Sequence, residues 1–180
     1  MKLYKIFLGS SIQPPVSYDR NAIGNFIRKI NDALRADDRN VYVELFLCEQ
    51  EDTSINPARE KQKQEEYDRY IREEANLFLN LYHENAGQFT VRELNVAKQT
   101  ARLGAENIQV WFLDCPQSSK GIAQLQGDLK AEGFPFYSYA HVDQVKVAVL
   151  RWLEKQEPGL PVIHQADAVR LGNHILLSKR

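Results

Sequence analysis

The chain of 180 residues is 43% hydrophobic, which is enough for one substantial core and favours one main domain. Its 23 Lys and Arg against 24 Asp and Glu give a net charge of −1, so no strong positive field indicates direct binding to nucleic acid or to an anionic membrane. No apolar run approaches the roughly 20 residues of a membrane-spanning helix, and we therefore expect no membrane association.

Two cysteines, Cys48 and Cys115, end separate apolar runs, and no signal-peptide pattern precedes them. This usage is typical of reduced thiols in the cytosol and not of a disulfide framework. We therefore expect a cytoplasmic protein whose thiols are structural.

Five short apolar segments predict buried strands. They are, in chain order, KLYKIFLGSS (2–11), VYVELFLC (41–48), NLFLNLY (76–82), NIQVWFLD (107–114) and FPFYSYA (134–140). Apolar residues at helical spacing follow each strand and predict helices. The helices lie at about 23–34, 63–75, 90–103, 122–129 and 142–153. The polar stretch from Glu49 to Lys63, with Pro57 inside it, is predicted as a long loop.

Strand and helix alternate five times, which predicts a parallel sheet with helices on both faces and right-handed crossovers. The fold class is therefore α/β, with a flavodoxin-like three-layer fold and a ligand crevice at the carboxyl ends of the strands. We assign residues 1–156 to this domain. Residues 157–180 carry two prolines and two glycines with only weak strand patterns, and are interpreted as a linker or as the start of a missing C-terminal domain.

Several kinds of chemistry are excluded by spacing. No G-x-G-x-x-G or G-x-x-x-x-G-K turn follows the first strand, and no G-x-S-x-G occurs. The four histidines lie far apart and fit no metal-ligand spacing with the cysteines, so we expect no metal site and interpret the histidines as surface or loop residues. These absences argue against P-loop or Rossmann phosphate binding and against serine hydrolysis.

Polar residues remain at the predicted crevice, where each strand ends. They are Ser10, Ser11, Glu49, Glu84, Glu93 and Asp114. Asn80 lies inside the third strand and needs a hydrogen-bond partner if it is buried. Tyr82, Trp111 and Phe112 lie in apolar runs and are interpreted as packing residues.

Glu93 has two interpretations on spacing alone. Thr90 and Glu93 form a T-x-x-E pattern that predicts a capping box at a helix start, with Phe89 and Leu94 placed for a hydrophobic staple. Glu93 also follows a very apolar strand directly, where open α/β sheets bind their ligands. A structural role and a catalytic role are both open at this point.

Four segments in this order resemble the TIR-like domains at the amino termini of bacterial multidomain defence and signalling proteins. They are KLYKIFLGSSI, DRNAIGNFIRKIND, QEEYDRYI and GQFTVRELNVA. The matching features are an acidic residue and arginine opening the first helix (Asp19 and Arg20), a tyrosine and acidic pair in the second (Tyr67 and Asp68), and a G-x-[FY]-T-x-x-E-[FL]-x-x-A run. The resemblance covers residues 1 to about 155.

The resemblance implies an activity, because many TIR domains hydrolyse or cyclise NAD+ with a glutamate on the helix after the third strand. Glu93 matches that glutamate. NAD+ or a related nucleotide would be the substrate and not a cofactor, and self-association would activate the enzyme. A C-terminal sensor domain would be a further partner, and the 49–63 loop would take the place of the loop that closes over substrate.

Five further residues are expected to bind that substrate. Ser10 and Ser11 would offer hydroxyl and backbone donors to its ribose or phosphates, and Arg20 would hold a phosphate or brace a carboxylate. Tyr67 would stack on the substrate or pack in the core, and Asn80 would reach the crevice or bond a neighbouring loop.

TIR domains also include scaffolds without activity, so a non-catalytic adaptor is the first alternative function. A nucleoside 2-deoxyribosyltransferase, which is related in outline and also breaks an N-glycosidic bond, is the second.

Overall fold

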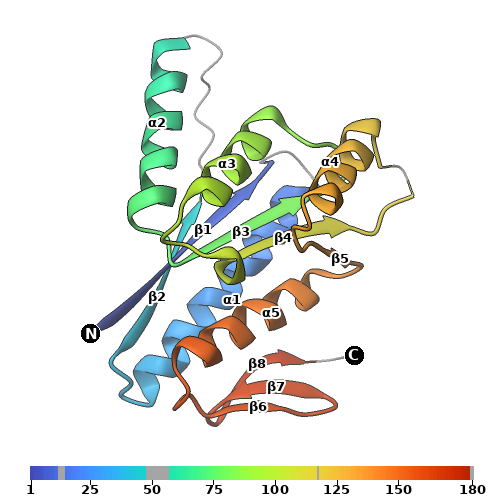
Figure 1. The fold of residues 1–180 in the computed structure, drawn as a ribbon. Helices are drawn as coiled ribbons and strands as arrows, with labels where there is room; N and C mark the ends of the chain where they lie inside the picture. The colour runs from blue at the N-terminus through green and yellow to red at the C-terminus, as the bar shows by residue number, and fades with distance from the viewer. Residues whose placement is uncertain (12–14, 48–56, 117, 179–180) are drawn as a thin grey trace.

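The computed structural model describes residues 1–11, 15–47, 57–116 and 118–178, except for the side chains of residues 57–60. Its main sheet has five parallel strands in the order β2-β1-β3-β4-β5 (Figure 1). Their bounds are β1 Lys2–Ser10, β2 Val41–Leu47, β3 Leu77–Tyr82, β4 Ile108–Leu113 and β5 Tyr137–Tyr139. This strand order is that of the flavodoxin-like fold, so the predicted fold class is confirmed.

Helices cover both faces of the sheet, as expected. Their bounds are α1 Val16–Ala36, α2 Pro57–Glu73, α3 Gln88–Gln99, α4 Lys120–Ala131 and α5 Val142–Gln156. Figure 1 shows α1 and α5 on one face and α2, α3 and α4 on the other. The strands alternate between these two cores, because successive side chains point to opposite faces. On β1, Ile6 and Leu8 join the core of α1 and α5, while Phe7 joins the core of α2, α3 and α4.

The second helix begins earlier than the sequence pattern indicates. The expected loop over 49–63 is wrong for residues 57–63, which form the first turns of α2. Pro57 suits a helix start because the first turn needs no N–H donor from it. Few apolar residues precede Tyr67 in the sequence, so the start of α2 has no apolar stripe to detect. Residues 48–56, with Cys48 and Glu49, lie outside the described ranges.

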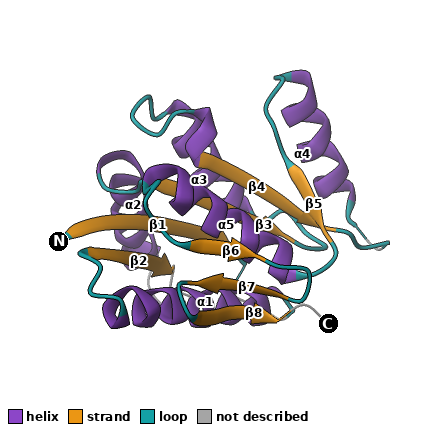
Figure 2. Ribbon diagram, turned by 90° about the horizontal axis from the view of Figure 1, so that it is seen from below, coloured by secondary structure: helices purple, strands orange, loops and turns teal. Residues whose placement is uncertain are grey.

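Residues 162–178 form a second, antiparallel sheet of three strands, β6 Val162–His164, β7 Ala168–Leu171 and β8 His174–Ser178. A tight turn joins β7 to β8, and Gly172 adopts a φ of +56° there, which glycine tolerates. Val169, Leu171 and Leu176 are buried in the core that α1 and α5 share. Figure 2 shows this small sheet beside those helices. The segment that suggested a linker or the start of another domain is thus packed against the main domain.

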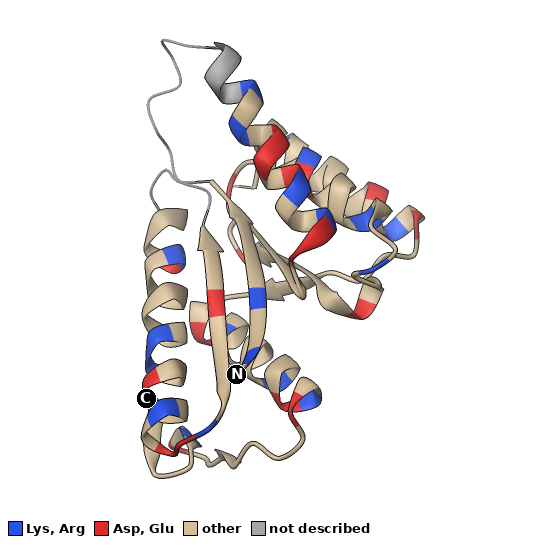
Figure 3. Ribbon diagram, turned by 90° about the vertical axis from the view of Figure 1, so that its left-hand side faces the viewer, with Lys and Arg blue, Asp and Glu red and all other residues tan. Residues whose placement is uncertain are grey.

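Positive and negative side chains are mixed over the helices, and no face of the molecule in this view carries charge of one sign alone. Figure 3 shows Lys and Arg interleaved with Asp and Glu along the helices. Among the helices in the described ranges, none has the length and apolar content needed to cross a bilayer.

Candidate functional site at the carboxyl ends of the strands

Glu93 lies against the end of β1, where its side chain closely approaches Gly9. A methyl group placed on Gly9 would lie 2.9 Å from Glu93 Oε2 and 3.0 Å from Asn80 Nδ2. Glu93 is 4% exposed and Asn80 is fully buried. The face of Gly9 therefore brings a carboxylate from α3 and an amide from β3 together.

The capping interpretation of Glu93 is wrong. Helix α3 begins at Gln88 with Gly87 as its N-cap, and no side chain caps it. Thr90 is already inside the first turn, and Phe89 is 41% exposed and closes no staple. Because the helix starts before Thr90, Glu93 falls in its second turn, on the inward stripe with Thr90, Leu94 and Ala97. The carboxylate is buried for a reason other than helix capping.

Asn80 and Tyr82 both hold the first turn of α3. Asn80 Nδ2 donates to the Thr90 carbonyl at 3.4 Å, and the Tyr82 hydroxyl donates to the same oxygen at 3.2 Å. Asn80 thus has the partner that its burial required, but Asn80 Oδ1 accepts no hydrogen bond within the described part of the chain. Burial, followed by the nearby charge of Glu93, raises the pKa of the Tyr82 hydroxyl, so it stays a donor.

Ser10 and Arg20 lie at the same edge but on the other face of the sheet. Alternation along β1 directs Ser10 to the side of α1, opposite to Gly9. Arg20 Nη1 donates to the Ser10 carbonyl at 3.4 Å, and both side chains are buried. Ser10 Oγ has no hydrogen-bond partner among the described residues. Ser11 is exposed and lines a cavity of about 120 Å³, which Thr90 also lines.

Tyr67 packs within an aromatic cluster on α2 and the sheet. Its ring centroid lies 6.3 Å from that of Phe7 and 5.8 Å from that of Phe46, both edge-on. Its neighbour Asp68 is buried and accepts from Arg92 Nη2 at 2.7 Å, which joins α2 to α3 beside Glu93. The contacts of Tyr67 are thus packing contacts, while those of Asp68 brace the helix that carries Glu93.

A second polar cluster, which the sequence pattern did not reveal, joins Asp19, His83 and Tyr139. His83 Nε2 lies 2.9 Å from Asp19 Oδ2, and the Tyr139 hydroxyl donates to the same oxygen at 2.9 Å. The Tyr139 oxygen also lies 2.8 Å from His83 Nε2. His83 lies in the bend after β3, as the loop interpretation expected, but it is 8% exposed and is therefore not a surface residue. Sequence separations of 64 and 120 residues gave no signal of this contact.

The geometry of this cluster determines where its protons lie. If His83 Nε2 carried no hydrogen, its lone pair would face the Asp19 carboxylate and be repelled by it. Nε2 therefore carries the hydrogen and donates it to Asp19. Burial raises the pKa of Asp19, but the hydrogen bonds from His83 and Tyr139 outweigh burial and the net pKa is below its usual value. His83 Nδ1 is buried without a partner among the described residues, and His83 lines the 120 Å³ cavity.

Replacing Tyr139 with phenylalanine is expected to lower the free energy of unfolding at neutral pH by about 1.5 kcal/mol, because the Asp19 carboxylate loses a donor. Because the pKa of Asp19 is lowered in the folded state, the stability that its carboxylate contributes is fully present above the unfolded pKa of about 3.9. That stability is lost as the pH falls through the folded pKa. The difference between parent and variant should therefore shrink below about pH 4. Denaturant unfolding over a pH series measures it. Tyr137→Phe, on an exposed ring of the same strand, should change little at any pH.

Replacing Gly9 with alanine is expected to lower the free energy of unfolding by about 1–3 kcal/mol and to displace the Glu93 carboxylate, because the added methyl overlaps it. Thermal or denaturant unfolding measures the loss. Gly127→Ala is the matched control, since nothing lies within 4 Å of its added methyl. In the interior of α4 that change should stabilise the protein by up to about 1 kcal/mol. Equal stability of the two variants would contradict the close approach at Gly9.

The site thus offers a buried carboxylate and amide on one face and an arginine and serine on the other. Of the remaining strand-end acids, Glu84 lines the small cavity, and Asp114 is exposed. Tyr82, Trp111 and Phe112 are buried, as predicted for packing residues. Within the described ranges, no three His, Cys, Asp or Glu side chains gather as a metal site would require. A larger cavity, of about 820 Å³, lies away from Glu93, beside α5.

In comparisons with known proteins, no protein-family model matches the chain, and no curated protein matches it.

Proposed function

We propose that the protein is a TIR-like NAD+ glycohydrolase that cleaves the bond between nicotinamide and ribose and is activated by self-association, in bacterial defence or signalling. The observation that carries the proposal is the Glu93 carboxylate, buried at the strand ends in a helix where it does no capping. A buried carboxylate is costly unless it is compensated, and such groups concentrate at functional sites.

The chemistry suits a single carboxylate. The pyridinium of NAD+ leaves as neutral nicotinamide, so its departure needs no general acid. The ribose carbon passes through an oxocarbenium-like state, and a nearby carboxylate stabilises that positive charge or holds a ribose hydroxyl. We assign this role to Glu93. Hydrolysis and cyclisation share this cleavage and differ only in the nucleophile that captures the sugar.

The other residues of the site support the proposal unequally. Asn80 lies against the same face of Gly9 as Glu93, and Ser11 lines the small cavity beside Thr90. Ser10 and Arg20 lie across the sheet edge, so a substrate that touched them and Glu93 would have to cross the ends of the strands. Tyr67 would need to leave its contacts with Phe7 and Phe46 in order to stack on a base.

Self-association is part of the proposal because the cavity at the strand ends is small and Glu93 is not among the residues that line it. Its volume of about 120 Å³ is below the range of about 300–1,000 Å³ that is usual for small-molecule sites. A dinucleotide therefore requires further residues to line its binding site, and a neighbouring copy of the chain or a C-terminal partner would supply them. Nicotinamide release from NAD+, measured over a series of protein concentrations and with a clustered fusion, should rise more steeply than in proportion to protein. A strictly proportional rate would contradict activation by assembly.

The same small cavity favours a second candidate function, a non-catalytic TIR-like adaptor. An adaptor would use the buried Glu93 and Asn80 only to fix α3 against β1 and β3. It predicts no nicotinamide release even in the clustered fusion. Base exchange on deoxynucleosides with no action on NAD+ would instead indicate a deoxyribosyltransferase.

A further inference from the structure

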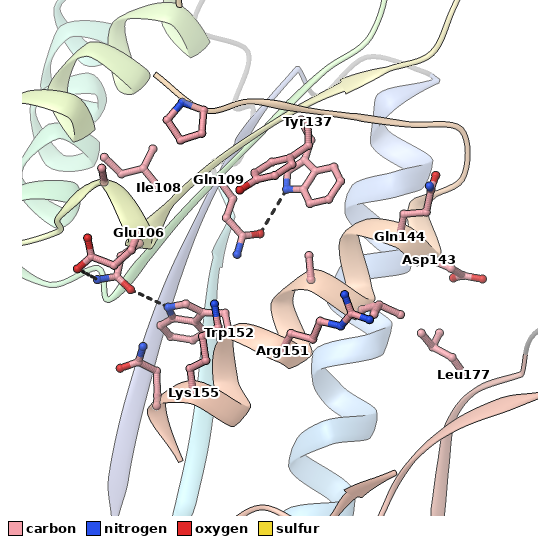
Figure 4. A pocket seen from close by; sticks show the side chains of 17 residues that line it. Glu106, Ile108, Gln109, Tyr137, Asp143, Gln144, Arg151, Trp152, Lys155 and Leu177 are labelled. Carbon is pink, nitrogen blue, oxygen red and sulfur yellow. Dashed lines mark hydrogen bonds between the residues drawn. The ribbon is translucent and has the colours of Figure 1, made fainter. Parts of the chain in front are cut away.

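A groove of about 820 Å³ lies beside α5, far from the face of the sheet that carries Glu93. It forms because β5 has only three residues and pairs with the second half of β4 alone. The expected strand over 134–140 is thus shorter in the structure, and α5 borders the open side of β4. Figure 4 shows this space, which we call the α5 groove, with Tyr137 on one side and Arg151 and Lys155 of α5 on the other. Its volume falls in the range of about 300–1,000 Å³ that is usual for small-molecule sites.

One wall of the α5 groove is aromatic. Tyr137 is 47% exposed, and its ring centroid lies 4.8 Å from that of Trp111 at a tilt of 31°. Trp152 lies further along the groove, and its Nε1 donates to Asn107 Oδ1 at 2.8 Å. Trp111 Nε1 donates to Gln109 Oε1 at 3.3 Å. Both indole N–H groups are satisfied, but Trp111 and Trp152 are buried, so the ring surface open to a ligand is mainly that of Tyr137, with Trp111 packed behind it. An exposed ring of this kind favours a planar aromatic ligand.

The opposite wall carries two cations without compensation. Arg151 and Lys155 are exposed, lie one helical turn apart and line the α5 groove. Within the part of the chain that the structure describes, neither forms an ion pair, whereas Lys146 on the same helix binds Asp143 at 2.8 Å. The dipole of α5 favours a cation in its last turn, which accounts for Lys155 but not for Arg151. Like charges at this spacing repel, and a bound anion would relieve the repulsion.

Two carboxylates also line the α5 groove, but at its ends. Asp143 is neutralised by Lys146, and Glu106 accepts a hydrogen bond from Asn107 Nδ2 at 3.4 Å. Figure 4 shows these two acids on either side of Arg151 and Lys155. The middle of the groove therefore combines exposed ring surface with positive charge.

We propose that the α5 groove is a binding site for a nucleoside phosphate, with the base against Tyr137 and Trp111 and the phosphate between Arg151 and Lys155. Base stacking and charge-assisted hydrogen bonds from arginine are the interactions by which proteins hold such ligands. The site is separate from Glu93, since Trp111 and Trp152 belong to the core of α1 and α5, whereas Leu94 of α3 belongs to the other core.

Tryptophan fluorescence tests the proposal locally, because the only two tryptophans of the chain, Trp111 and Trp152, both line the α5 groove. Excitation at the red edge of indole absorption avoids absorption by adenine. Titration with AMP is expected to give a saturable change with a Kd below about 1 mM, a binding free energy of about −4 kcal/mol or stronger. Arg151→Gln and Lys155→Gln should each weaken AMP binding about tenfold, and adenosine should bind the parent as weakly as AMP binds the double variant.

Tyr137→Ala should weaken AMP and adenosine alike, by about fivefold or more, since it removes the stacking surface. Matched controls are Arg69→Gln on α2 and Tyr18→Ala on α1, both exposed and away from the groove, and both should bind AMP like the parent. Glu93→Gln should also leave the titration unchanged, whether or not the protein is a glycohydrolase.

Three results would overturn the proposal. The first is the absence of any AMP-dependent change at millimolar concentration. The second is AMP binding by the Arg151→Gln and Lys155→Gln variants that is as tight as binding by the parent, or a loss of AMP binding in Glu93→Gln as large as the loss in those variants. The third is a fluorescence change that follows protein concentration alone and is lost in Tyr137→Ala, which would assign the α5 groove to contact between copies of the chain.

Discussion

Replacing Glu93 with glutamine is expected to lower nicotinamide release from NAD+ by about 100-fold or more, because a preorganised charge that stabilises a transition state is typically worth that much. Glutamine keeps the volume that packs over Gly9 and the capacity to hydrogen-bond. Only the negative charge is lost. Initial rates of nicotinamide release, at a protein concentration where the parent is assembled, measure the effect.

The stability of the same variant separates catalysis from folding. A neutral amide is less costly to bury than a carboxylate, so the free energy of unfolding should stay the same or rise. Glu66→Gln, on the exposed side of α2, is the matched control and should release nicotinamide at the parent rate. If Glu93→Gln is folded and assembled like the parent and keeps the parent rate, the catalytic assignment of Glu93 is wrong.

Replacing Leu171 with alanine is expected to lower the free energy of unfolding of the whole domain by about 2–5 kcal/mol, because it opens a cavity in the core that α1 and α5 share. Leu171 is 1% exposed. Since β7 packs on α1, the loss should appear in one cooperative transition and not as separate melting of the small sheet. Denaturant unfolding followed by far-UV circular dichroism and by tryptophan fluorescence measures it.

Ile175 supplies the control within the same sheet. It is 50% exposed, so Ile175→Ala should change the free energy of unfolding by no more than about 0.5 kcal/mol. Similar, small effects of the two substitutions would mean that residues 162–178 are not part of the core. Two separate transitions in Leu171→Ala would mean that the small sheet folds by itself.

The candidate site residues on the two faces of the sheet are held by different helices. Glu93 depends on the helix layer of α2 and α3, since Asp68 and Arg92 join those helices. Asp19 and Arg20 depend on α1, which the small C-terminal sheet supports. We therefore expect Leu171→Ala to affect the Ser10 and Arg20 face more than the Glu93 face.

The fold class was predictable from the sequence because periodicity is a local property of the chain. Ile6 and Leu8 alternating with Phe7, and the helical stripe from Ile23 to Leu34, determine which face each element buries. The order of the parallel strands came from the structure, and right-handed crossovers then account for the face on which each connecting helix lies. The position of Glu93 after the third strand was visible in the same way.

The rest was decided by tertiary contacts, because burial of a polar group depends on segments that are distant in sequence. The T-x-x-E pattern predicted a cap at Thr90, but α3 begins at Gln88, and Glu93 lies inside the helix with its carboxylate against Gly9. No local pattern could bring Asp19, His83 and Tyr139 to one point. The sequence by itself determined the layers and the candidate acid; only the folded chain decided that this acid is buried, because α3 meets β1 where no side chain separates them.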